Sequence, residues 1–97
     1  MIRIVKMTFK EEHVADFNAL FEARKDRIRH FPGCTYLELW KDQKDPTVYY
    51  TYSIWQDESN LEEYRVSDLF QDTWSTVKQW FREKPHAFSA SKLMSIV

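Results

Sequence analysis

The stretch VYYTYSIW at residues 48–55 decides the fold, because it is the clearest strand in the chain. Nearly all of its residues are β-branched or aromatic, and these types favour the pleated, half-buried surface of a sheet. Alternate residues of a strand point to opposite faces. One face therefore carries Val48, Tyr50, Tyr52 and Ile54, and the other carries Tyr49 and Trp55. Both faces are apolar, whereas an antiparallel sheet commonly exposes one polar face to water.

Upstream of this strand the sequence predicts a hairpin and a helix. Residues 34–40, CTYLELW, have the composition of a second strand. The short polar loop at residues 41–46 joins the two strands most simply as an antiparallel hairpin. Residues 10–30 place their apolar side chains at helical spacing, and the turn Pro32-Gly33 ends this helix.

Downstream, the sequence predicts a second helical region with a break at Ser67-Asp68 and an end at Pro85. Residues 2–9 and 86–97 supply the two remaining strands. The element order is then β-α-β-β-α-β, which is the ferredoxin-like arrangement of an α+β fold. We expect one domain of 97 residues, with a four-stranded antiparallel sheet and the helices on one of its faces.

The second apolar face of the sheet predicts a homodimer. In the first strand, Ile2 and Ile4 lie opposite Val5, Met7 and Phe9, so this strand also has two apolar faces. The helices can cover only one of them. A domain this short buries a modest fraction of its own surface. A second copy packed sheet to sheet is the simplest cover for the other face.

Composition and charge exclude several classes of protein. The formal net charge is −1 and the basic residues are spread along the chain, so we expect no binding to nucleic acid or to an anionic membrane. No stretch approaches the roughly 20 apolar residues of a membrane span, and we expect a cytoplasmic protein. Cys34 is the only cysteine, which excludes an intramolecular disulfide and a cysteine-based zinc site. A single glycine excludes a glycine-rich phosphate loop, so no nucleotide cofactor is expected.

Four segments together carry a family resemblance: the first strand, the FPGC turn at residues 31–34, the aromatic strand ending at Trp55, and LEEYRVSDLF at residues 61–70. In order and spacing they resemble the antibiotic biosynthesis monooxygenase family of dimeric α/β barrels. The resemblance implies that two subunits face each other sheet to sheet, with a ligand pocket between the sheet and the helices of each. It also implies chemistry, since some members oxidise phenols, quinols or anthrones with molecular oxygen and without a metal or flavin. Fold alone does not select one activity.

The chain departs from the family's common pattern at several positions. Tyr64 and Leu69 stand where many members have histidines. Members that degrade haem use an asparagine, a tryptophan and a histidine, and the corresponding positions here are Lys6 or Met7, Tyr64 and Trp74. None of the three matches, so haem degradation is not expected.

The candidate catalytic residues are Glu38 and Tyr64. An oxygenase without a cofactor needs a base or an oxyanion stabiliser inside an aromatic pocket that excludes water. Glu38 lies in the middle of the second predicted strand. Burial among aromatic residues would raise its pKa and make it a base. The alternative is an exposed or interfacial carboxylate paired with a lysine or arginine.

The candidate substrate-binding residues are aromatic or basic. Those that can hold an aromatic ring are Tyr50, Tyr52, Trp74 and Trp80, which can equally be ordinary core residues. Arg24 and Arg65 can orient an anionic substrate, and His86 can reach the mouth of a pocket; all three can equally be surface residues. The histidines lack the spacing of metal ligands, so no metal site is predicted.

The sequence thus favours a cofactor-independent monooxygenase that acts on a small aromatic or quinol-like molecule. One alternative is a non-catalytic dimeric module that binds such a molecule without converting it. Another is a purely structural subunit, in which side chains fill the space between sheet and helices.

Overall fold

The computed structural model describes all 97 residues. It contains four strands, three α-helices and two short 3-10 helices. In chain order these elements are β1 (Ile2–Thr8), η1 (Glu11–His13), α1 (Val14–Arg29), β2 (Cys34–Lys41), β3 (Val48–Trp55), α2 (Glu58–Arg65), α3 (Asp68–Val77), η2 (Lys78–Trp80) and β4 (His86–Ala90).

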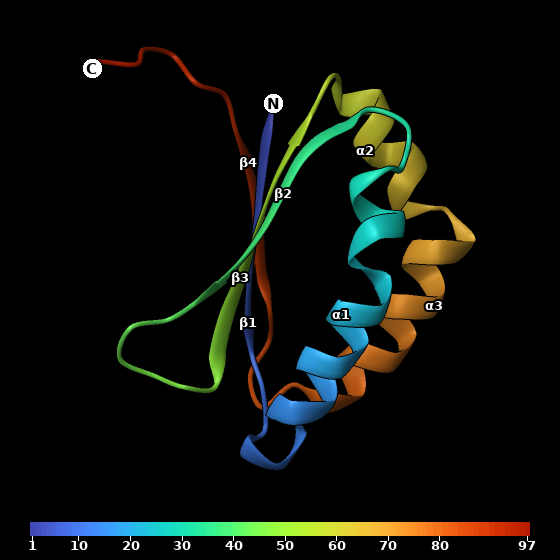
Figure 1. Cartoon of the computed structure of the whole chain (residues 1–97), viewed down its shortest axis with the longest axis vertical. Coiled ribbons are helices and arrows are strands. Elements are labelled where there is room, and N and C mark those ends of the chain that lie inside the picture. The colour runs from blue at the N-terminus through green and yellow to red at the C-terminus, as the bar shows by residue number, and fades with distance from the viewer.

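The elements form two layers, a twisted sheet and a helical layer that covers one of its faces (Figure 1). The strands lie in the order β2-β3-β1-β4, and every neighbouring pair is antiparallel. The predicted ferredoxin-like α+β fold, with all helices on one face, is therefore confirmed. No helix combines the length and the apolar character needed to cross a membrane.

Side-chain caps separate the two helices that follow β3. The carboxylate of Asp57 accepts a hydrogen bond from the backbone N–H of Ser59 at the start of α2. The hydroxyl of Ser67 accepts one from the backbone N–H of Phe70, at 3.2 Å, at the start of α3. Such caps satisfy backbone groups that have no partner inside the helix. The predicted break at Ser67-Asp68 is thus confirmed.

The turn between α1 and β2 depends on Gly33, which is the only glycine in the chain. Its φ is 88°, a left-handed conformation that side chains rarely adopt. A Cβ at this position would also collide with the side chain of Asn60 on α2. The glycine therefore lets the start of β2 pack directly against α2.

The last strand is shorter than the sequence predicts. We expected a strand over residues 86–97, whereas β4 ends at Ala90 and the chain then leaves the sheet (Figure 1). The cause lies in the register, because Ala90 pairs with Ile2 at the very start of β1. Beyond Ala90 there is no residue of β1 left to accept or donate backbone hydrogen bonds.

Two hydrophobic clusters occupy the inner face of the sheet, which is the face that the helices cover. One contains Met7, Phe9 and Phe17 at the C-terminal end of β1. The other contains Trp55 and Leu61 and packs against Met1 at the opposite end of the strand. The middle of the inner face, between these clusters, is where a site can form.

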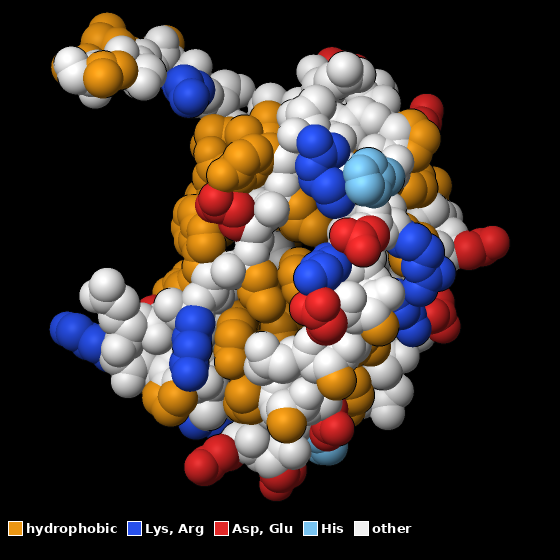
Figure 2. Space-filling view, in the orientation of Figure 1, with side chains coloured by type: hydrophobic (Ala, Val, Ile, Leu, Met, Phe, Trp, Pro, Cys, Tyr) orange, Lys and Arg blue, Asp and Glu red, His pale blue; other side chains and the backbone are white.

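The outer face of the sheet is also apolar, as predicted. Ile4 pairs with Tyr52 on one side and with Phe88 on the other, so these residues share that face. Tyr36, Trp40 and Phe88 remain 43%, 39% and 52% exposed. Figure 2 shows hydrophobic side chains along this side of the molecule. It is the face for which the sequence predicts a partner subunit.

Candidate functional site

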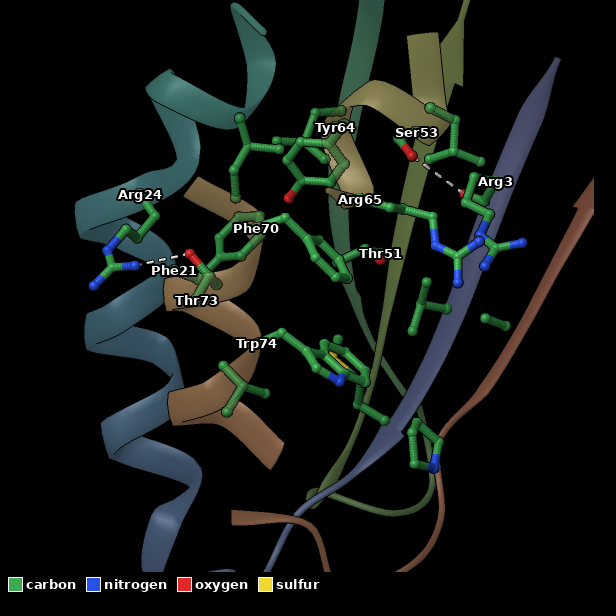
Figure 3. A pocket seen from close by; sticks show the side chains of 18 of the residues that line it. Arg3, Phe21, Arg24, Thr51, Ser53, Tyr64, Arg65, Phe70, Thr73 and Trp74 are labelled. Atoms are coloured by element: carbon green, nitrogen blue, oxygen red, sulfur yellow. Dashed lines mark hydrogen bonds between the residues drawn. The ribbon is translucent and has the colours of Figure 1, made fainter. Parts of the chain in front are cut away.

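A cavity of about 270 Å³ lies between the inner face of the sheet and the three helices (Figure 3). Of the 21 residues that line it, 14 are hydrophobic. Strands β1 and β3 supply one wall, and residues of α1, α2 and α3 supply the others. Side chains therefore do not fill this space, so the prediction made for a purely structural subunit is wrong.

Short side chains in the middle of the sheet create the cavity. On the inner face of β3, Thr51 and Ser53 stand between the large residues Tyr49 and Trp55. Across the sheet, β4 contributes Ala87 to the same surface. Protein interiors otherwise fill such space at close-packed density. Large residues at the ends and small ones in the middle therefore leave an opening at the centre.

Aromatic rings from the helices face this opening. Phe70 and Trp74 lie four residues apart on α3, and their rings stack at a centroid distance of 5.7 Å with an angle of 10° between the planes. Tyr64, near the end of α2, meets Phe70 edge to face at 5.2 Å. The three rings form a wall against which a flat apolar molecule can pack.

Tyr64 brings the one phenol hydroxyl to this wall. Burial raises the pKa of Tyr64 well above its usual value, because the interior disfavours the phenolate. No protein group hydrogen-bonds to the hydroxyl, which lies between the helices and the sheet in Figure 3. At neutral pH the group is therefore a neutral hydrogen-bond donor that a bound molecule can use, and it is not a base.

Three arginines line the cavity, whereas no lining residue is acidic. Arg24 on α1 donates a hydrogen bond to the hydroxyl of Thr73 at 2.8 Å and lies 2.8 Å from the carboxylate of Asp72. This arginine therefore joins α1 to α3 and already has a counter-charge. The guanidinium groups of Arg3 and Arg65 approach the cavity from β1 and α2 (Figure 3).

Four of the nine predicted site residues line the cavity, namely Tyr64, Trp74, Arg24 and Arg65. The other five predicted residues lie elsewhere, namely Glu38, Tyr50, Tyr52, Trp80 and His86. The alternation of β2 and β3 accounts for the first three, because they belong to the outer face of the sheet.

The buried environment that would make Glu38 a base is not observed, and the structure is nearer to the alternative of an exposed or interfacial carboxylate, with Tyr36 and Trp40 as partners in place of a lysine or arginine. Its carboxylate accepts hydrogen bonds from the hydroxyl of Tyr36 and, at 2.9 Å, from the indole N–H of Trp40. These two donors lower the pKa of Glu38, whereas burial in an aromatic pocket would have raised it. The residue is thus a stabilised carboxylate on the far side of the sheet from the cavity.

The remaining predicted residues also have other surroundings. The ring of Tyr52 stacks on Trp40 at 5.0 Å, and the hydroxyl of Tyr50 donates a hydrogen bond to Asp42 at 2.9 Å. Trp80 on η2 packs against the first core cluster. His86 at the start of β4 lines a separate polar hollow. No group of three or more His, Cys, Asp or Glu side chains is placed to hold a metal ion.

Sequence reasoning missed several lining residues, of which Arg3 is the most informative. The signal was present, because Arg3 precedes Val5 and Met7 at the two-residue spacing of a strand and shares their inner face. Thr51 and Ser53 could have been found in the same way from their position between Tyr49 and Trp55. Phe70 belongs to the apolar stripe of α3, and spacing alone does not distinguish a cavity wall from a filled core.

The fold and the cavity together define a class of protein, namely ferredoxin-like domains with a ligand-sized, largely apolar cavity between the sheet and the helices. Residues 1–75 match the family model described as antibiotic biosynthesis monooxygenase. The chain therefore belongs to the antibiotic biosynthesis monooxygenase family, and the resemblance seen in the sequence is confirmed.

Solved structures support the same fold. An antibiotic biosynthesis monooxygenase superimposes with a TM-score of 0.88 and 19% identity, covering 97% of this chain and 100% of that one. The protein Rv0793 from Mycobacterium tuberculosis gives a TM-score of 0.88 with 16% identity, covering 99% and 97%. A conserved protein from Methanosarcina mazei Go1 gives a TM-score of 0.84 with 22% identity, covering 90% and 87%. A search of the curated proteins found no match.

Proposed function

We propose that the chain is a monooxygenase that oxidises a small aromatic or quinol-like molecule with molecular oxygen and without a metal or flavin. The cavity carries this proposal, because it combines an aromatic wall, a free phenol donor and guanidinium groups in a mostly apolar space. Membership of a family described as monooxygenases supports the reaction type.

The cavity would bind the ring of the substrate through its apolar walls. The stacked pair Phe70 and Trp74 offers one flat surface, and Val5 and Met7 on β1 offer another. Aromatic side chains bind flat rings through area burial and offset stacking. Water is displaced on binding, which strengthens the electrostatic interactions inside.

The first chemical step is removal of a proton from the substrate, for example from an activated CH2 group beside a phenol ring. No carboxylate or imidazole lines the cavity, so the protein would act by stabilising the anion while the proton passes to bulk water outside the cavity. The guanidinium groups lower the pKa of a bound acid through their positive charge. The neutral hydroxyl of Tyr64 donates a hydrogen bond to the developing oxyanion.

The second step is the reaction with oxygen. The electron pair of the carbanion forms a bond to one atom of O2, and protonation of the other atom gives a hydroperoxide. Loss of water then leaves a carbonyl group, so CH2 and O2 become C=O and H2O. The substrate supplies all four electrons, and the reaction needs no external reductant.

Oxygen uptake by metal-stripped protein, measured with a panel of hydroquinones, naphthoquinols and anthrones, tests this function. We expect saturable uptake that survives chelator and falls roughly 100-fold in Tyr64→Phe, the size of effect typical of a lost oxyanion donor. Tyr50→Phe is the matched control, because it removes a hydroxyl from the outer face. Equal rates in both variants would contradict the role of Tyr64, and uptake no greater than that of heat-denatured protein would contradict the function.

A non-catalytic binding module is the second candidate, and the absence of acidic and histidine side chains from the cavity lining favours it. Such a module would bind the same aromatic molecules and release them unchanged. A panel compound that raises the melting temperature by several degrees, with no oxygen uptake and no product by mass spectrometry, would support this candidate over the enzyme.

We also propose that two copies pack through the outer face of the sheet. The exposed residues Tyr36, Trp40 and Phe88 on that face support this, as does the apolar tail after β4, where Leu93 is 96% exposed. Light scattering at micromolar concentration should give twice the mass of 11.8 kDa. Phe88→Glu would place a charge in the interface and yield a monomer, whereas Ala23→Glu on the exposed surface of α1 would leave the mass unchanged.

A further inference from the structure

The charges around the cavity are unbalanced. Its lining contains three arginines and no acidic residue. Arg24 has its counter-charge in Asp72, at 2.8 Å, and its side chain is held by Thr73. The positive charge that lacks a counter-charge therefore belongs to Arg3 and Arg65.

Arg3 and Arg65 share a single carboxylate. Glu62 lies 3.4 Å from the guanidinium of Arg65 and is also the acidic group that acts on Arg3. The direct side-chain partner of Arg3 is neutral, because the Arg3 guanidinium donates its hydrogen bond to the hydroxyl of Ser89, at 3.1 Å. Two guanidinium groups and one carboxylate leave one positive charge without a counter-charge at this side of the cavity.

This arrangement is unfavourable while no anion is present. Burial and the nearby charge of Arg65 both lower the pKa of Arg3, because each disfavours the charged guanidinium. Arg3 is nevertheless held in place by its contact with Ser89 on the neighbouring strand β4. An anion bound between the two arginines would relieve the repulsion and replace the lost hydration.

We propose that Arg3 and Arg65 bind the carboxylate of an aromatic acid whose ring packs against Phe70 and Trp74. In Figure 3 the two guanidinium groups lie beside β1, and the aromatic rings lie between them and α1. A planar guanidinium fork matches a carboxylate in shape, and one uncompensated positive charge matches a monoanion.

The size of the cavity limits the rest of the molecule. Its volume of about 270 Å³ lies just below the range of typical small-molecule sites, which is ~300–1,000 Å³. One ring or two fused rings with short substituents therefore suit it. As a substrate class this assignment rests on the proposed function, whereas the binding of the acid can be measured without turnover.

Isothermal titration calorimetry with 1-hydroxy-2-naphthoate and its neutral amide, 1-hydroxy-2-naphthamide, tests the proposal. The two probes share shape and differ in charge. Wild-type protein should bind the acid at least about tenfold more tightly, as expected for hydrogen bonds to a charged group. Arg3→Gln and Arg65→Gln should each reduce this preference to about threefold or less, whereas Arg27→Gln, on the exposed surface of α1, should retain it.

Equal affinity of the wild type for acid and amide would overturn the proposal, and so would an undiminished preference in Arg65→Gln. Circular dichroism reports whether each variant folds; Arg65 is exposed on α2, so its variant decides the matter if Arg3→Gln does not fold. A preference that depends on both arginines, without oxygen uptake for the corresponding hydroquinone acid, would support the carboxylate site and contradict the oxygenase. Oxygen uptake with an anthrone, together with equal affinity for the acid and the amide, would support the oxygenase and contradict the carboxylate site.

Discussion

The two faces of the sheet carry similar aromatic side chains but differ in how their polar groups are satisfied. On the outer face, the hydroxyls of Tyr36 and Tyr50 donate to the carboxylates of Glu38 and Asp42. On the side of the inner face, the hydroxyl of Tyr64 on α2 has no protein partner and borders a cavity without acidic residues. Two tyrosines of the outer face are therefore paired with carboxylates, whereas the space beside the inner face leaves a donor and positive charge available.

This difference shows why aromatic content alone does not locate a binding site. Aromatic residues suit a core, a subunit interface and a ligand pocket equally well. Buried polar groups in proteins are normally paired. A half-buried hydroxyl without a protein partner and two arginines that share one carboxylate are therefore stronger indicators of a ligand than the rings beside them.

The largest expected difference between the faces concerns stability. Trp55→Ala should lower the free energy of unfolding by about 3–5 kcal/mol, because Trp55 is fully buried on the inner face and its loss leaves a void. Trp40→Ala on the outer face should change it by less than about 1 kcal/mol at low protein concentration, since this side chain is partly exposed. Urea unfolding followed by far-ultraviolet circular dichroism measures both.

The same experiment sharpens the comparison when it is repeated at high protein concentration. In a sheet-to-sheet dimer, association stabilises the wild type, and the effect of Trp40→Ala grows with concentration. If Trp40→Ala and Trp55→Ala lowered the free energy of unfolding equally at every protein concentration, the outer face would be as tightly packed within one subunit as the inner face, and the comparison would fail.

A smaller effect should follow from filling the cavity. Thr51→Leu adds volume at the centre of the inner face, so the affinity for 1-hydroxy-2-naphthoate should fall roughly tenfold, which is about 1.4 kcal/mol. Stability should be unchanged or rise by up to about 1 kcal/mol, because apolar side chains replace empty space. Thr76→Leu on α3, outside the cavity lining, is the control. Unchanged affinity in Thr51→Leu would show that the ligand binds elsewhere.

The fold could be predicted from the sequence because its signals are local. The two-residue period of β3 and β1 and the turn at Pro32-Gly33 set the element order without knowledge of the packing. The length of β4 could not be predicted in the same way. Its end at Ala90 depends on the register against Ile2, which is a contact between distant parts of the chain.

The site could be predicted only in part, for two different reasons. The sequence analysis placed Glu38 in the cavity, whereas its neighbour Leu37 is the residue that lines it. Adjacent residues of a strand face opposite sides of the sheet, so only one of the two can point into the cavity. That error could have been avoided from the alternation alone. The cavity itself could not be predicted, because its volume depends on how side chains from four strands and three helices fill a shared space.

The smallest expected effect concerns pH and the carboxylate of Glu38. Hydrogen bonds from Tyr36 and Trp40 hold its pKa below the usual value of 4.5 in the folded protein. A depressed folded-state pKa contributes stability above the unfolded pKa, and this contribution is lost as the pH falls below it. Wild-type stability should therefore decline more steeply on acidification below about pH 5 than that of Glu38→Gln, which has no charge to lose.

The urea midpoint measured from pH 6 to pH 3 tests this, with Glu63→Gln at an exposed position of α2 as the control. The control should follow the wild-type curve, because it leaves the Tyr36 and Trp40 donors paired with a carboxylate. Parallel curves for the wild type and Glu38→Gln would mean that the outer-face carboxylate is not held as described. The contrast between a paired outer face and an available inner face would then lose its clearest example.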